Sequence, residues 1–332
     1  MHLIQFLDSS AQRRVGIVPD SAGNIVPLAG VHTLRDLALT ARRQGQGLAA
    51  YVASLLTDPS LIYSELLAAG RVLAPLDHPD PAHCLVSGTG LTHLGSAQAR
   101  NAMHATLAAD ENTLTDSMKI FRWGVQGGKP TDGSAPVQPE WFYKGDGGII
   151  AAPGHPLVSP GFADDGGEEA ELAGLYVIDD EGLPCRVGFA LGNEFSDHVM
   201  EKKNYLYLAH SKLRPASIGP EVIVGDLPDA FEGKASVTRG DQELWSAPFA
   251  TGEGNMAYTF KNLEYHHFKY SGFCRPGDVH VHFFGAAVLS FGAKLVIEDG
   301  DLMTISAPPF HLPLTNPLRQ LPSGQPPAVH CL

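Results

Sequence analysis

Cysteine is scarce in this chain, which has only four among its 332 residues. Cys84, Cys185, Cys274 and Cys331 lie far apart in the sequence, and no two of them form a Cys-x-x-Cys pair. This usage fits a protein that is kept reduced, and we therefore expect a cytoplasmic location.

Long apolar runs and an excess of positive charge are absent as well. No stretch approaches the roughly 18 consecutive apolar residues of a membrane-spanning helix. Residues 1–6 lack the basic and apolar regions of a signal peptide. Lys and Arg number 23 against 36 Asp and Glu, a formal net charge of −13. Because phosphate contacts need clusters of basic residues, we expect no nucleic-acid partner and no membrane partner.

A proline-rich segment at residues 75–82 divides the chain. Its three prolines restrict the backbone and favour a stiff, extended connector. We predict a small N-terminal α+β domain over 1–74 and a larger domain over 83–313. The segment 321–332 is again rich in proline, and we expect a disordered tail there.

Hydrophobic patterns predict the main elements of each part. In the first part, 15–19 and 24–28 form a hairpin, and 33–43 and 48–56 are helices. In the second part, strands dominate, with one helix that carries an apolar stripe and stops at Gly272. Its predicted strands cover 169–178, 185–191, 221–224, 235–238, 243–245 and 279–284, its helix covers 255–270, and turns fall at 179–182, 240–241 and 299–300, the last closing a hairpin.

The segment Glu169-Ala170-Glu171 opens the first of these strands. Side chains alternate across a strand, so the two carboxylates point to one side, about 7 Å apart. Glu194 arrives at the end of a neighbouring predicted strand. Three hard oxygen ligands suit Mg²⁺ or Mn²⁺. A solvated acidic strand edge explains the same residues equally well, because Glu-x-Glu pairs are common.

The order of several motifs resembles the fumarylacetoacetate hydrolase superfamily over roughly His83 to Leu312. Glu169 and Glu171 match the Glu-x-Glu metal ligands of that family, and Glu194 stands where a third acidic ligand follows. The other stretches are each less specific, and the order carries the resemblance. They are Ser87-Gly88-Thr89-Gly90-Leu91-Thr92-His93, Pro139-Glu140-Trp141-Phe142-Tyr143-Lys144, Asn193-Glu194-Phe195-Ser196, Leu208-Ala209-His210-Ser211-Lys212 with Gly219-Pro220, Pro276-Gly277-Asp278, and Phe284-Gly285-Ala286-Ala287.

This resemblance implies a fold, a metal and a site. The fold is α+β, a mixed β-roll catalytic domain behind a small N-terminal domain. The metal is Mg²⁺ or Mn²⁺ on Glu169, Glu171 and Glu194, and the partner is a small-molecule 2-keto acid bound by a homodimer. Lys212 is implied as a catalytic residue, and the implied substrate-binding residues are Ser87, Gly90, Thr92, Lys144, Gly285 and Ala286.

The sequence departs from the family pattern at two places. The third ligand of the family is normally Asp, and here it is Glu194. Hydrolases of the family carry His-x-x-Glu to activate water, and those positions fall on Ser96 and Ala99. Without that base, water has no obvious activator. The sugar-acid branch, which dehydrates 2-keto-3-deoxy aldonic acids, is expected to share this loss, and the chain looks most similar to its L-arabinose members.

The resemblance therefore implies loss of water from a 2-keto-3-deoxy pentonate, the L-arabinonate form in the first place, to give 2,5-dioxopentanoate. We predict that Lys212 is the base for the C3 proton, with a pKa lowered by the metal, and that His93 or water is the acid. An acylpyruvate or 2,4-diketo-acid hydrolase is the alternative enzyme. A non-catalytic keto-acid binding protein is the alternative outside enzymes.

Two further groups have ordinary interpretations. His280 and His282 share one strand face, as zinc ligands might, but no clear third ligand accompanies them. We expect core or interface histidines there. Asp197 and His198 follow Glu194 closely, and a helix-start aspartate is the favoured interpretation.

Overall fold

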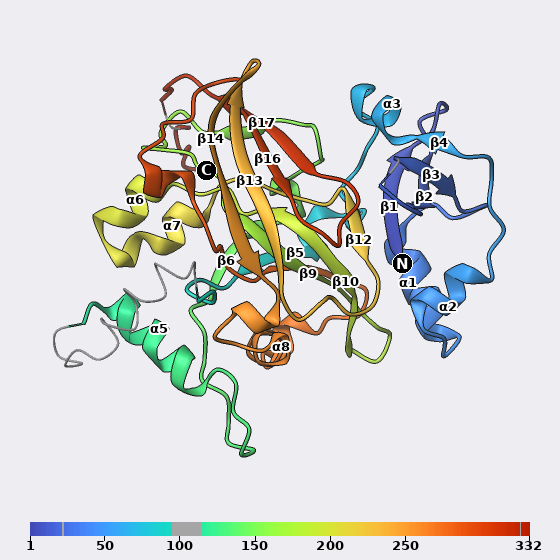
Figure 1. The fold of residues 1–332 in the computed structure, drawn as a ribbon, viewed down its shortest axis with the longest axis horizontal. Helices are drawn as coiled ribbons and strands as arrows, with labels where there is room; N and C mark the ends of the chain where they lie inside the picture. The colour runs from blue at the N-terminus through green and yellow to red at the C-terminus, as the bar shows by residue number, and fades with distance from the viewer. Residues whose placement is uncertain (22, 95–113, 326) are drawn as a thin grey trace.

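The computed structural model describes residues 1–21, 23–94, 114–325 and 327–332 of the chain. Within these ranges the strands form two mixed sheets, and helices cover their edges and faces (Figure 1). The larger sheet has twelve described strands, in the order β4-β3-β2-β1-β12-β10-β9-β15-β5-β6, with β11 and β7 attached beside β10.

Most neighbours in the larger sheet run antiparallel, while β15 and β5 are parallel, as are β11 and β7. Its strands are β1 His2–Leu7, β2 Arg13–Ile17, β3 Asn24–Pro27, β4 Leu61–Ile62, β5 Cys84–Gly88, β6 Phe142–Asp146, β7 Ile150–Ala151, β9 Ala170–Ile178, β10 Pro184–Asn193, β11 Ala216–Ile218, β12 Glu221–Ile223 and β15 Val279–Phe283.

The smaller sheet has five described strands in the order β14-β13-β16-β17-β8. Its strands are β8 Leu157–Ser159, β13 Phe231–Arg239, β14 Gln242–Thr251, β16 Leu302–Ser306 and β17 Leu314–Gln320. The predicted turn at 240–241 joins β13 to β14, as expected. The predicted hairpin at 299–300 is wrong, because no strand precedes that turn and β16 pairs instead with β13 and β17.

The helices are short, and α1, α5, α6 and α8 begin at residues whose side chains cap them. Thr33 accepts a hydrogen bond from the backbone N–H of Asp36, and α1 buries Leu34, Leu37 and Ala38 as its pattern predicts. The α-helices are α1 Leu34–Arg43, α2 Leu48–Ala53, α3 Tyr63–Ala68, α5 Asp116–Gly127, α6 His198–Lys203, α7 Leu208–Lys212 and α8 Phe260–Phe268, and the 3₁₀ turns are Pro81–His83, Gly147–Ile149, Tyr205–Tyr207, Glu253–Asn255, Ser271–Phe273 and Ser290–Ala293.

The helix predicted over 255–270 begins later than expected. Thr259 caps α8 by accepting from the backbone N–H of Asn262, and a separate 3₁₀ turn ends at Asn255. The helix also ends at Phe268, before the predicted stop at Gly272. A local capping hydroxyl thus overrides an apolar stripe that continues through Met256.

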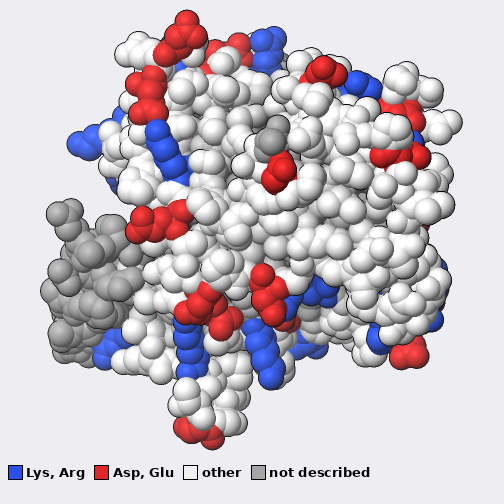
Figure 2. All heavy atoms as spheres, turned by 45° about the vertical axis from the view of Figure 1, so that its right-hand side comes forward, with Lys and Arg blue, Asp and Glu red and all other residues white. Residues whose placement is uncertain are grey.

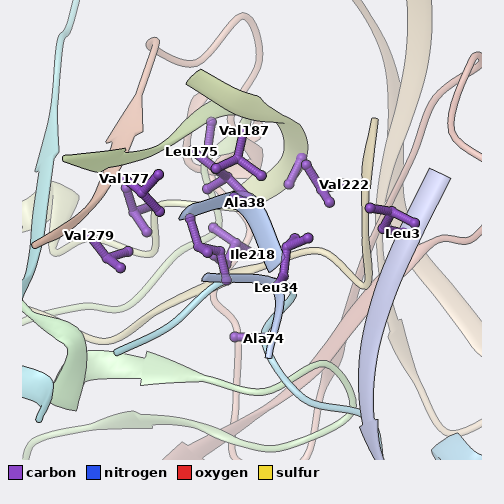
Figure 3. Close-up of a cluster of buried hydrophobic side chains, with 14 of the residues drawn as sticks. Leu3, Leu34, Ala38, Ala74, Leu175, Val177, Val187, Ile218, Val222 and Val279 are labelled. Atoms are coloured by element: carbon purple, nitrogen blue, oxygen red, sulfur yellow. The ribbon is translucent and has the colours of Figure 1, made fainter. Parts of the chain in front are cut away.

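The N-terminal 74 residues continue the large sheet. Strand β1 pairs with β12, with Ile4 opposite Glu221. Figure 3 shows Leu3, Leu34 and Ala38 of the first part interleaved with Leu175 and other side chains of the later strands, all in one buried cluster. The domain boundary at 75–82 therefore stays a prediction from the sequence, and side-chain packing is continuous across it.

Charged side chains are distributed over the surface in mixed sign. On the face in Figure 2, acidic and basic groups lie around a broad uncharged area. Within the described part of the chain, none of the helices combines the length and apolar character needed to cross a bilayer.

Candidate metal centre

Three carboxylates meet where β9 and β10 run side by side. In this antiparallel pair Gly192 lies opposite Glu171, and Asn193 lies opposite Ala170. One residue further along, the backbone N–H of Glu194 donates to the carbonyl of Glu169 at 3.1 Å. Oxygen atoms of Glu169, Glu171 and Glu194 therefore lie within 4.8 Å of one another.

The alternation predicted for Glu169 and Glu171 is present. Ala170 and Leu172, between and after them, pack into the cluster on the other face of β9. The carboxylate side of the strand continues into Ala173 and Leu175, which belong to the cluster that includes α1. The side chains of the two glutamates therefore project from the same face at the N-terminal end of the buried strand β9.

All three carboxylates are buried, with 6%, 2% and 0% of Glu169, Glu171 and Glu194 exposed. Burial, and then the negative charges of Glu194 and Glu169, raise the pKa of Glu171 well above its usual range. The solvated-edge interpretation is therefore wrong, because these groups lie away from water. A cation among the three oxygens would relieve their repulsion, so the donor set fits a hard divalent ion such as Mg²⁺.

Lys212, at the end of α7, lies against two of these carboxylates. Its Nζ donates to Glu169 at 2.5 Å and to Glu194 at 2.8 Å, and Glu201 lies 3.7 Å away. Burial lowers the pKa of Lys212, but the surrounding carboxylates outweigh it and raise that pKa well above its usual range. In the arrangement described, the lysine is charged, which is opposite to the lowered pKa that we predicted for a metal-loaded site.

Lys144, in β6, is fully buried behind Glu194. It forms an ion pair with that carboxylate, and its Nζ donates to the carbonyls of Glu194, Phe195 and Lys212, the last two at 2.8 and 3.0 Å. These partners occupy the donors of the ammonium group. Lys144, which we predicted to bind substrate, thus holds the chain around Glu194 in this structure.

His198 and Glu168 are two further buried groups next to these carboxylates in the structure or the sequence. His198 Nε2 lies 3.1 Å from Glu169, and although burial lowers the pKa of His198, this bond and the charge of Glu169 together raise it. Glu168 accepts from the backbone N–H and the hydroxyl of Ser290 at 2.7 and 2.6 Å. Asp197 caps α6, as predicted.

Glu140 is the acidic residue that our sequence reasoning missed. It accepts from the hydroxyl of Tyr205 at 3.2 Å, and a Cβ at Gly90 would lie 1.8 Å from its Oε1. Burial raises the pKa of Glu140 to about 7, against the attraction of Lys212. The sequence offered one sign of this role, because Glu140 lies within the segment that matches Pro-x-x-Phe-x-Lys. The structure places it beside Gly90, a predicted substrate-binding residue.

Gly285 and Thr92 lie together beside Glu171. The backbone N–H of Gly285 donates to Glu171 Oε2 at 2.7 Å, and the Thr92 hydroxyl donates to the carbonyl of Phe284. Gly285 has φ of +95°, and a Cβ there would lie 2.2 Å from Thr92 Oγ1. Only glycine meets both conditions. Ala286 follows and is half-buried.

Ser87 and His93 point elsewhere. Ser87 Oγ lies 2.8 Å from His282 Nδ1, on the face of β5 opposite Val86, whereas the carboxylates lie on the Val86 side of the sheet. The two nitrogens of His93 lie 3.1 and 2.9 Å from the hydroxyls of Thr92 and Thr251. Burial lowers the pKa of His93 to about 4, so it is neutral at pH 7 and we withdraw the acid role.

His280 and His282 are core residues, as we expected. They pack with His267, whose Nε2 lies 2.9 Å from His280 Nδ1. Burial lowers the pKa of His280 to about 4 and of His282 to about 3, so both are neutral. The positions that replace the family's water-activating pair, Ser96 and Ala99, lie outside the described residues.

The whole chain is similar in structure to several solved enzymes. The apo form of a 2-keto-3-deoxy-D-arabinonate dehydratase matches with a TM-score of 0.70 at 17% identity, covering 97% of this chain and 100% of that one. The structure of such a dehydratase complexed with magnesium and 2,5-dioxopentanoate matches at 0.69 and 16%, with the same coverage. A 5-carboxymethyl-2-hydroxymuconate delta-isomerase from Mycobacterium smegmatis matches at 0.57 and 18%, again over 97% and 100%.

No family model matches the sequence, and no curated protein matches it. At identities of 16–18% the likeness shows the fold. The chain therefore shares the α+β architecture of these proteins over the part that the structure describes, and the fold class that the resemblance implied is confirmed.

Proposed function

We propose that this protein is a Mg²⁺- or Mn²⁺-dependent dehydratase of 2-keto-3-deoxy pentonates that forms 2,5-dioxopentanoate. One observation carries the proposal: three buried carboxylates and Lys212 converge at one point of the fold. A solved structure with this fold is a dehydratase complexed with magnesium and 2,5-dioxopentanoate. The L-arabinonate form is the substrate that the sequence resemblance favours.

Glu169, Glu171 and Glu194 would hold the ion. When bound, a divalent ion would polarise the 2-keto group and so lower the cost of removing a proton from C3. The chain supplies the rest of the site. Lys144 and His198 fix two of the carboxylates, and the N–H of Gly285 fixes the third.

We assign the removal of the C3 proton to Lys212. The amine must be neutral to accept it, and the adjacent carboxylates favour the charged form in the described arrangement. Lys212 therefore becomes a base only as those negative charges are compensated. Its ion pairs also orient Nζ toward the centre of the site.

Glu140 is our choice for the acid that protonates the departing C4 hydroxyl, in place of His93. With a pKa of about 7, a large share of its carboxyl groups carry a proton at neutral pH. Lys212 takes one proton from C3 and Glu140 gives one to the hydroxyl, so one water leaves. The 5-hydroxy-2-keto-3-enoate that remains tautomerises to 2,5-dioxopentanoate without a change in mass.

The same Glu140 keeps the hydrolase alternative open, since its carboxylate form could activate water. An assay with Mg²⁺ on both enantiomers of the 2-keto-3-deoxy pentonate and on 2,4-diketo acids separates the two. A five-carbon product lighter by one water supports the dehydratase. Pyruvate as the main product contradicts it, and no turnover with any acid favours the binding protein.

Deuterium exchange at C3 tests Lys212 separately, because exchange needs only proton removal. We expect Lys212→Ala to slow exchange, and Lys212→Met, which keeps the apolar stem, to slow it equally. Normal exchange in both variants would remove Lys212 from the mechanism.

We also propose a homodimer in the cytoplasm. The resemblance implies the dimer, and the cysteine usage favours the location. Light scattering on the purified protein measures the assembly, and a mass equal to one chain contradicts the dimer.

A further inference from the structure

A second group of metal-ligating side chains lies outside the three-glutamate group. His2 is the first residue of β1, Glu221 begins β12, and His311 lies in the loop between β16 and β17. His2 Nδ1 lies 2.9 Å from Glu221 Oε2, and His311 Nδ1 lies 4.0 Å from the same oxygen. One ligand atom from each residue lies within 4.8 Å of the other two.

An ordinary ion pair accounts for only part of this group. Glu221 is fully buried, and its Oε1 accepts the backbone N–H groups of His311 and Leu312. Its Oε2 is occupied by His2. The Nδ1 atom of His311 is buried and has no hydrogen-bond partner. A buried nitrogen without a hydrogen-bond partner destabilises the folded state. A metal ion bound to His311 Nδ1 would remove this cost.

Tyr63 adds a second unpartnered atom in this neighbourhood. The side chain is buried, and its hydroxyl has no hydrogen-bond partner. The charge of Glu221 adds to burial in raising the pKa of Tyr63. A buried carboxylate is thus accompanied by two polar atoms that lack partners.

We propose that His2, Glu221 and His311 form a binding site for Zn²⁺ or a similar transition-metal ion. Two imidazoles and one carboxylate are a common zinc donor set, whereas the all-oxygen set of the three glutamates suits Mg²⁺. Bonds of about 2.0–2.2 Å in a tetrahedral site space ligand atoms roughly 3.3–3.5 Å apart. The separations of 2.9 and 4.0 Å from Glu221 Oε2 lie on either side of that spacing.

The two imidazoles must tilt to bind one ion. Their rings are stacked with centroids 3.9 Å apart and an interplanar angle of 6°, so the in-plane lone pairs of the two rings lie in nearly parallel planes. The side chains of His2 and His311 are 15% and 25% exposed, which leaves room on the solvent side for this movement and for a water as fourth ligand.

An ion at this site would join three separate parts of the chain. It would tie the first strand, the start of β12 and the β16–β17 loop together, and so fasten the N-terminal segment to both sheets. The site is therefore structural in kind, and it is independent of the proposed dehydratase activity.

Zinc titration by calorimetry in a Glu171→Gln background tests the site, because that change weakens the other centre. We expect one Zn²⁺ per chain and a rise in Tm on loading. Adding His311→Gln or His2→Gln to this background should weaken Zn²⁺ binding at least ~100-fold. Even substitution of a residue that only supports a metal ligand costs about 10–100-fold in metal affinity. His32→Gln, an exposed histidine on the N-terminal segment, is the matched control and should bind as the background does.

The outcome decides between a metal site and a plain histidine–glutamate contact. Equal Zn²⁺ affinity in the background and in both double variants would overturn the proposal, as would no Zn²⁺ uptake by the background. Circular dichroism without metal checks that each variant folds. If His311→Gln is unfolded, the His2→Gln variant alone decides, because the ring of His2 hydrogen-bonds to the side chain of Glu221 and is partly exposed.

Discussion

At the scale of single residues, Glu171 is the most informative carboxylate of the proposed metal site. It is buried, its charge is disfavoured by two neighbouring carboxylates, and its one described hydrogen bond comes from a backbone N–H. A divalent ion would remove the conflict. The raised pKa of this buried carboxyl group is the strongest physical argument for the proposed metal site.

Glu171→Gln should therefore abolish metal binding and turnover together. A neutral amide is a weaker ligand for a hard ion, and the remaining two carboxylates do not replace it. We expect Mg²⁺ affinity to fall at least ~100-fold by calorimetry, at the upper end of what outer-shell changes cost. Glu232→Gln, an exposed glutamate on β13, is the control. Unchanged Mg²⁺ affinity in Glu171→Gln would place the ion elsewhere.

The raised pKa of Glu140 predicts that both activity and stability depend on pH. Its pKa rises from 4.5 to about 7 in the folded protein. Between these values the unfolded chain has lost the proton that the folded chain keeps, so the folded state binds more protons and stability falls as pH rises. Activity should fall above about pH 7, where the acid form disappears.

Glu140→Gln separates the two effects. The variant should lose roughly 10²-fold or more in kcat, because general acid catalysis is worth about that much. Its Tm should decline less than that of the wild type between pH 5 and 8, because the group that loses its proton is gone. Parallel Tm curves for the two proteins would show that Glu140 is not the titrating group.

Residue-level prediction from the sequence succeeded where the information is local. The alternation of Glu169 and Glu171 needs only the strand itself. The position of Ser87 was not predictable in this way, because its face depends on how β5 pairs with β15, 195 residues away, and how β15 pairs with β9, at least 102 residues away. Glu140 was missed because its raised pKa comes from burial, which composition and spacing do not report.

At the scale of elements, the loop after β15 illustrates how backbone positions a ligand. Gly285, the second residue after β15, has a positive φ and directs its N–H to Glu171. Further along, Ser290 donates twice to the buried Glu168. The loop is thus hydrogen-bonded to two acidic residues near the start of β9, and it fixes the carboxylate of Glu171, a proposed metal ligand.

Gly285→Ala should damage both the fold and the site. The added Cβ would lie 2.2 Å from Thr92 Oγ1, and φ of +95° is strained for alanine. We expect a loss of about 1–3 kcal/mol in the free energy of unfolding, measured by denaturant titration, together with weaker Mg²⁺ binding. Gly292→Ala is a matched control in the same loop, since a Cβ there meets nothing within 4 Å. Normal stability and Mg²⁺ affinity in Gly285→Ala would contradict this role.

The start of α1 was predictable, because the pattern and the cap Thr33 agree. The start of α8 was not, because the apolar stripe favoured an earlier beginning than the cap Thr259. The supposed hairpin at 299–300 failed for a different reason. Its turn residues are present, but the partner of β16 is β17 and not a preceding strand.

At the scale of the whole molecule, residues 1–74 and the later strands fold around common side chains. Leu34 of α1 lies in the cluster with Leu175 and Val222. Arg42 and Arg43 pair with Asp179 and Asp180 in the turn between β9 and β10, at 2.9 and 2.7 Å. The change in composition at the proline-rich connector is visible in the sequence. The packing across the connector is not, because it depends on contacts between residues that are distant in the sequence.

We therefore predict a single cooperative unfolding transition for the whole chain. Leu34→Ala removes a fully buried side chain from the shared cluster and should lower the free energy of unfolding by about 2–5 kcal/mol. Because the cluster belongs to both parts, calorimetry should show one peak that moves to lower temperature without splitting, with equal calorimetric and van't Hoff enthalpies. Leu56→Ala, at an exposed leucine of the same segment, should leave the peak in place. Two peaks in the wild type, of which Leu34→Ala moves only one, would mean that residues 1–74 unfold as an independent domain.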